Sequence, residues 1–104
     1  MENFTINLFG IDYSVEYVNE TLDMKGMNGR IYYDEQIIRV KRDLMRDTKK
    51  NTLLHEIIHS VLNSSGLESV LDKNNIDVEF FTETLTNSLF NVIKSNKELM
   101  KKLF

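Results

Sequence analysis

The sequence predicts an α+β fold, in which a small antiparallel sheet of three or four strands, from the N-terminal half, packs on two long helices and a short C-terminal helix. Residues 4–42 contain runs in which apolar and polar side chains alternate, and this period of two is typical of strands. Residues 47–94 instead repeat apolar side chains at helical spacing. The chain of 104 residues contains no proline and only four glycines, so we expect one domain over residues 1–104.

The first two strands are expected to form a hairpin. Residues 3–18 alternate in polarity on both sides of Gly10, and glycine suits a tight turn. Residues 19–28 have no clear period, so we expect a connecting loop there.

A second pair of strands is predicted over residues 29–33 and 36–42, with a turn at residues 34 and 35. The last strand, residues 37–41, places charged side chains between apolar ones. Because charges discourage pairing with another chain, they suit an edge. We therefore expect residues 37–41 at the edge of the sheet.

The first long helix is expected to begin at Asp47 or Thr48, since both residue types cap helix N-termini. It should end just before Gly66, because glycine favours the left-handed conformation that follows many helices. Its apolar stripe consists of Leu54, Ile57, Ile58, Val61 and Leu62.

The second long helix is expected to begin near Asn75 or Asp77 and to continue to about Lys94. Its apolar stripe consists of Val78, Phe81, Leu85, Leu89, Val92 and Ile93. Residues 95–104 are predicted to form a short final helix. That helix should dock through Leu99, Met100, Leu103 and Phe104.

Composition excludes several classes of function. With 13 Lys and Arg against 16 Asp and Glu, the net charge of −3 argues against direct binding of nucleic acid. No apolar run approaches the ~20 residues that a membrane span requires, so we expect a cytoplasmic protein. The chain has no cysteine, so thiolate zinc sites are excluded and any metal must be bound by histidine and carboxylate.

The central motif is H-E-x-x-H at residues 55–59, and it contains the only two histidines of the chain. Residues four apart share a helix face, so His55 and His59 can direct their imidazoles at one ion. Glu56 is expected to lie toward solvent, where it could activate a metal-bound water. The motif therefore predicts a catalytic zinc site.

A catalytic zinc ion (Zn2+) keeps three protein ligands and one open position. Without cysteine or a third histidine, the third ligand must be Asp or Glu. Glu79 is preferred, because the chain between it and His59 accommodates a helix end, a turn and the first turn of a second, packed helix.

Alternatives to Glu79 remain at this stage. Glu83 lies one turn further along the same helix face, where it could be the ligand or could orient an imidazole N–H. Glu68, Asp72 and Asp77 lie in or beside the segment between the helices and are weaker candidates.

Residues 52–59, T-L-L-H-E-I-I-H, followed by E-x-x-x-E-x-L-x-N-x-L at residues 79–89, resemble the minimal zincin metallopeptidases of phages and mobile elements. These are relatives of the ImmA/IrrE metallopeptidases. Their zinc is held by H-E-x-x-H and a downstream glutamate, which is the gluzincin pattern. The strand pair before the helix also looks like that group, so the resemblance covers roughly residues 4 to 100.

The resemblance implies a zinc-dependent endopeptidase that cleaves a protein such as a repressor or another regulator in a phage or integrative element. Carried over by position, His55, His59 and Glu79 become the zinc ligands and Glu56 the general base. A substrate segment could then lie in extended form along residues 37–41, the expected sheet edge.

The chain departs from the gluzincin pattern in one respect. Many gluzincins stabilise the oxyanion with a later His or Tyr, and here neither residue type follows His59. Side chains of the strands could approach the site instead, although packing or solvated edge positions are their more common roles. These candidates are Arg30, Tyr32, Tyr33 and Arg39.

Two other interpretations remain, and the first of them follows from this departure and from the small size of the chain. One is a catalytically silent zinc-binding domain that acts as a protein-interaction module. The other is a metal-free helical interaction domain in which both histidines are incidental.

Overall fold

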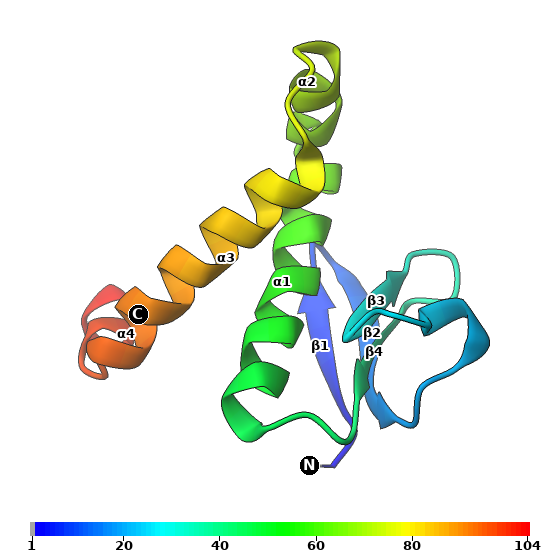
Figure 1. Cartoon of the computed structure of the whole chain (residues 1–104). Coiled ribbons are helices and arrows are strands. Elements are labelled where there is room, and N and C mark those ends of the chain that lie inside the picture. The colour runs from blue at the N-terminus through cyan, green and yellow to red at the C-terminus, as the bar shows by residue number, and fades with distance from the viewer. Residues whose placement is uncertain (1) are drawn as a thin grey trace.

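The computed structural model describes residues 2–104 and confirms the α+β class (Figure 1). The N-terminal half contains β1 (Phe4–Leu8), β2 (Ile11–Val18), a short 3-10 helix η1 (Leu22–Met24), β3 (Gly29–Tyr32) and β4 (Ile37–Lys41). The C-terminal half contains α1 (Arg46–Ser64), α2 (Leu67–Lys73), α3 (Val78–Ser95) and α4 (Leu99–Leu103).

The described strands form one mixed sheet in the order β1-β2-β4-β3. Both predicted hairpins are present, because β1 pairs with β2 and β3 with β4 in antiparallel fashion. The expectation of a wholly antiparallel sheet is wrong, since the central pair, β2 and β4, is parallel. The two hairpins therefore join side by side through their second strands.

The expectation that residues 37–41 form an edge is also wrong, because β4 lies between β2 and β3. Its apolar residues Ile38 and Val40 are fully buried. Its charges are neutralised by neighbouring carboxylates rather than exposed at an edge. Arg39 lies 3.4 Å from Glu16 of β2, and Lys41 forms a similar ion pair.

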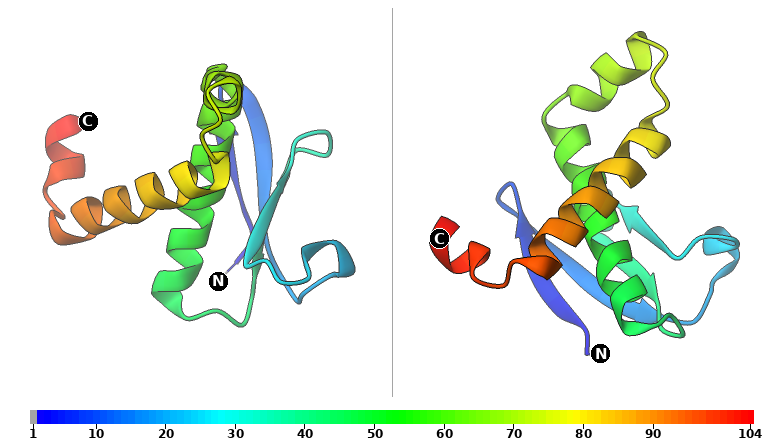
Figure 2. Two further views of the ribbon diagram at one scale, coloured as in Figure 1. Left: turned by 45° about the horizontal axis from the view of Figure 1, so that its top comes forward. Right: turned by 60° about the vertical axis from the view of Figure 1, so that its left-hand side comes forward.

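The core lies between the sheet and α1, which runs across one sheet face (Figures 1 and 2). Its buried residues are Tyr13, Val15, Tyr17, Ile38 and Val40. Leu53 and Ile57 of α1 pack against this cluster. The spacing of these two residues on α1 matches one helix face, so the sheet fixes the rotation of the helix about its axis.

β3 approaches α1 so closely that Gly29 has no room for a side chain. A Cβ at this position would lie 2.6 Å from Thr52 Cγ2 and 2.9 Å from the Arg39 carbonyl oxygen. The preceding segment, residues 19–28, is largely irregular as expected. It also contains η1, whose Met24 is fully buried and ties the segment to the body.

The ends of α1 were partly predicted. Gly66 follows the helix with a φ of 79°, in the left-handed conformation expected of it. The helix begins one residue before Asp47, and its N-cap is Met45, so neither Asp47 nor Thr48 caps it. The short helix α2 was not predicted.

The helix α3 begins after Asp77, one of its two expected caps, and packs on α1 with a narrow face. Its fully buried residues are Thr82 and Thr86 rather than the apolar stripe. Four members of that stripe are exposed: Leu85, Leu89, Val92 and Ile93.

The helix α4 lies at the far end of α3 (Figures 1 and 2). Its expected docking side is mostly exposed, since Met100, Leu103 and Phe104 all face solvent, so that expectation is wrong. Within residues 2–104, no helix combines the length and the apolar character that a membrane crossing would require.

Candidate metal centre

Two imidazoles of α1 lie side by side at the surface of the helix that faces α3. His55 and His59 are one helical turn apart, and their Nε2 atoms are 3.1 Å from each other. Both side chains are mostly buried, with exposed fractions of 16% and 19%. The two imidazoles therefore have little freedom to turn apart from each other.

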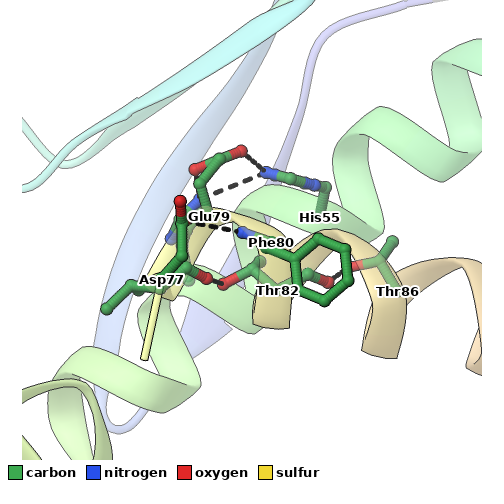
Figure 3. Close-up of polar contacts among 8 residues, drawn as sticks. His55, Asp77, Glu79, Phe80, Thr82 and Thr86 are labelled. Carbon is green, nitrogen blue, oxygen red and sulfur yellow. Dashed lines mark hydrogen bonds and ion pairs between the residues drawn. The ribbon is translucent and has the colours of Figure 1, made fainter. Parts of the chain in front are cut away.

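Glu79 of α3 completes the cluster, and its carboxylate spans the two imidazoles. Figure 3 shows this carboxylate beside His55. Glu79 Oε1 lies 2.7 Å from Nε2 of His55, and Glu79 Oε2 lies 2.9 Å from Nε2 of His59. The structure thus brings together the three residues that the sequence singled out as a ligand set.

Local features of α3 explain why Glu79 reaches the histidines. The Asp77 carboxylate accepts a hydrogen bond from the Phe80 backbone N–H at 3.0 Å and so fixes the first turn, which contains Glu79. The small residues Thr82 and Thr86 allow α3 to approach α1 closely. Their hydroxyls donate to helix carbonyls one turn earlier, at 2.7 and 2.6 Å, so both are buried without an unpaired polar group (Figure 3).

This donor set fits a metal ion. One ligand atom from each of His55, His59 and Glu79 lies within 4.8 Å of the others. Tetrahedral zinc with bonds of about 2.0–2.1 Å requires ligand atoms roughly 3.3 Å apart. The two histidine nitrogens, 3.1 Å apart, are close to this spacing, and Glu79 places Oε1 2.7 Å from the His55 nitrogen and Oε2 2.9 Å from the His59 nitrogen. The three side chains could therefore hold a metal ion.

Glu56 lies beside this cluster, but the expectation that it faces solvent is wrong. Its side chain is only 7% exposed, because β3 covers it where Gly29 meets α1. Burial, followed by the charge of Glu79, raises the pKa of Glu56 to about 7. A backbone hydrogen bond from Ile31 and the charge of Arg30 lower the pKa in part. Glu56 can thus exchange a proton near neutral pH.

The cluster opens into a cleft of about 800 Å³ between β3, α1 and the start of α3. Glu68 and Glu83 line this cleft but do not join the group of converging ligand atoms. Among the described residues, neither Asp72 nor Asp77 joins that group either. Asp77 instead caps α3.

The candidate oxyanion donors separate into two groups. The Tyr32 hydroxyl donates to the Asp23 carboxylate, and the Arg39 guanidinium pairs with Glu16, so neither is directed at the cleft. Tyr33 and Arg30 line the cleft.

The role of Gly29 was not predicted from the sequence, although a glycine within an alternating strand is itself a signal of close backbone approach.

Comparisons of the chain with protein-family models, with curated proteins and with solved structures found no match.

Proposed function

We propose that the protein is a zinc-dependent metalloendopeptidase of the gluzincin type, related to the ImmA/IrrE metallopeptidases. One observation carries the proposal: His55, His59 and Glu79 converge on one point, with the buried carboxylate of Glu56 beside them in the same cleft. The substrate class is a protein, such as a repressor or another regulator of a phage or mobile element.

The donor set favours zinc. Two imidazole nitrogens and one carboxylate are typical of catalytic zinc sites, and they leave a coordination position open toward the cleft. When bound, zinc supplies Lewis acidity that polarises a carbonyl and makes a water molecule easier to deprotonate. His55, His59 and Glu79 hold the ion in this proposal.

Glu56 is the general base in this proposal. Its carboxylate lies in the same cleft as the three ligands, so it can accept a proton from the attacking water and return that proton to the leaving amine. Because the side chain is buried between α1 and β3, it loses little conformational freedom when it acts.

An extended substrate can pair with the free edge of β3. The Lys41 N–H donates to the Asn28 carbonyl at 2.8 Å, and hydrogen bonding alternates along an antiparallel pair. The backbone groups of Gly29 and Ile31 therefore point away from β4. Both residues line the cleft, and the Ile31 N–H is directed at Glu56, so the Gly29 N–H and the carbonyls of Gly29 and Ile31 would hold a peptide beside the metal. This edge replaces residues 37–41, whose strand is paired on both sides.

A second candidate is a zinc-binding domain without catalysis that binds a partner protein. The observation in its favour is the exposed apolar stripe of α3. Exposed apolar surface of this kind is common at interaction sites.

Cleavage by the zinc-loaded protein separates these two functions. We expect the wild type to cleave members of a complex peptide mixture, with new termini detected by mass spectrometry. Glu56→Gln should keep zinc and lose roughly 100-fold or more in rate, because the general base is removed. Glu98→Gln, a matched change on the surface outside the cleft, should cleave like the wild type. A fully zinc-loaded wild type that cleaves nothing would favour the second candidate.

A further inference from the structure

Peptide hydrolysis places negative charge on the carbonyl oxygen of the scissile bond, and a hydrogen-bond donor held at that oxygen speeds the reaction. The chain offers no His or Tyr after His59 for this task. A tyrosine or arginine that serves as the donor must therefore come from an earlier part of the chain. This inference rests on the proposed function.

Most earlier donors are occupied or buried elsewhere. Tyr13 and Tyr17 belong to the core, with exposed fractions of 5% and 4%. The Tyr32 hydroxyl donates to Asp23. None of these three phenols lines the cleft.

The two nearby arginines are also engaged. Arg30 reaches the rim of the cleft, but it donates to the Asp23 carbonyl at 3.0 Å, and its guanidinium lies over the Tyr32 ring. Arg39 pairs with Glu16 and lies over the same ring. Both guanidinium groups are thus held on the Tyr32 side of the hairpin.

Tyr33 is the tyrosine that remains. It directly follows β3, and the alternation of strand side chains places it on the same face as Gly29 and Ile31, toward α1. Its side chain lines the cleft together with both histidines and Glu56. The residue is 39% exposed, so the phenol is partly packed and still accessible to a substrate.

The Tyr33 hydroxyl stays protonated across the working pH range of a peptidase. Burial raises the pKa of Tyr33 to about 12, with smaller contributions from the charges of Glu68, Tyr13 and Glu56. No hydrogen bond contributes to this shift, whereas the Tyr32 pKa is affected by its bond to Asp23. Among residues 2–104, no acceptor affects the pKa of Tyr33, so its O–H is a neutral donor that a substrate can reach.

We propose that Tyr33 donates a hydrogen bond from its hydroxyl to the carbonyl oxygen of the scissile bond as that oxygen gains negative charge. The proton stays on the phenol, and the bond strengthens as charge develops. Tyr33 is then a catalytic residue supplied by the sheet.

The test compares zinc-loaded wild type, Tyr33→Phe and Tyr32→Phe by calorimetric titration with a phosphoramidate dipeptide. The tetrahedral phosphorus of this probe imitates the carbonyl carbon after attack by water, and its oxygens take the places of the oxygens on that carbon. Tyr33→Phe should bind the probe roughly 100-fold more weakly, because one donor to the oxyanion is lost. Its zinc content should be unchanged, and Tyr32→Phe should bind like the wild type. For a peptide that the wild type cleaves, Tyr33→Phe should lower kcat with little change in KM. Tyr33→His should recover part of this loss in kcat.

Wild-type affinity in Tyr33→Phe would overturn the inference and leave the proposed function intact. Loss of zinc by Tyr33→Phe would also overturn it, because the phenol would then have a structural role. A zinc-loaded wild type that does not bind the probe would instead contradict the proposed function itself.

Discussion

At the scale of single residues, Glu56 combines burial with a second carboxylate nearby. A carboxylate in such a place resists ionisation, because it loses hydration and meets the charge of Glu79. A bound cation would offset both effects. Ionisation of Glu56 therefore costs more free energy in the metal-free protein than it would in the metal-loaded protein.

This cost of ionising Glu56 should appear in the pH dependence of the free energy of unfolding. The pKa of Glu56 is raised from 4.5 to about 7, so folded Glu56 holds its proton more tightly than unfolded Glu56. Metal-free wild type should thus lose stability as pH rises from about 5 to about 7 and then level off. Glu56→Gln removes this loss and should be more stable than wild type by up to about 3 kcal/mol at pH 8.

Urea denaturation of chelator-treated protein at several pH values measures the difference. Glu83→Gln is the matched control, because it removes an exposed carboxylate from the same cleft. Parallel pH profiles for wild type and Glu56→Gln would show that Glu56 ionises normally.

The three converging side chains were predictable from the sequence, whereas the burial of Glu56 was not. The spacing of His55 and His59 is local to one helix, and Glu79 begins a second helix with a recognisable cap. Glu56 is buried by β3, and that contact depends on Gly29, which is distant in sequence. The pattern of apolar residues along a helix does not indicate which strand covers that helix.

At the scale of elements, the contact between β3 and α1 sets the width of the cleft. Gly29→Ala should destabilise the fold by about 2 kcal/mol, because its methyl group would overlap Thr52 and the Arg39 carbonyl. Thr52→Ser removes the nearest methyl group and should recover part of this loss in the double variant, as a double-mutant cycle by thermal denaturation would show. A stable Gly29→Ala with unchanged metal affinity would contradict such a tight contact.

The N-terminus of α3 presents the third candidate ligand. Asp77→Ala removes the cap and should cost about 1 kcal/mol of stability. It should also weaken zinc binding several-fold, because Glu79 lies in the turn that the cap fixes. Asp77→Asn keeps a capping oxygen and is the control in a competitive zinc titration. Equal zinc affinity in Asp77→Ala would show that the rest of α3 suffices to position Glu79.

The pairing of elements was less predictable than the elements themselves. Alternation identified both hairpins, but it does not specify which strands of two hairpins become neighbours. Arg39 and Lys41 indicated an edge, yet carboxylates of β2 and of the loop that follows β2 pair with them. The short helix α2 has too few turns for helical periodicity to stand out.

At the scale of the whole molecule, α3 packs on α1 and α2 and makes no extensive contact with the sheet within the described residues (Figure 2). Two polar contacts fix its C-terminal half to α1. Asn51 donates to Asn87 at 3.2 Å, and Lys94 pairs with Asp47. The N-terminal half is fixed by the buried threonines and by Glu79, so a metal ion would join it to α1.

Removal of zinc should therefore loosen α3 more than the sheet. In amide hydrogen exchange followed by mass spectrometry, chelation should speed exchange over residues 78–86 more than over β2 and β4. Zinc-free Glu79→Ala should exchange alike with and without chelator. Uniform acceleration across the chain would indicate that the ion affects global stability only.

The central claim is a zinc centre held by three side chains, and elemental analysis of untagged protein tests it most directly. We expect about one zinc per wild-type chain, its loss in His59→Ala and Glu79→Ala, and its retention in Glu83→Gln. A wild type that binds no zinc, or a Glu79→Ala variant that keeps it, would contradict a zinc centre built from these side chains.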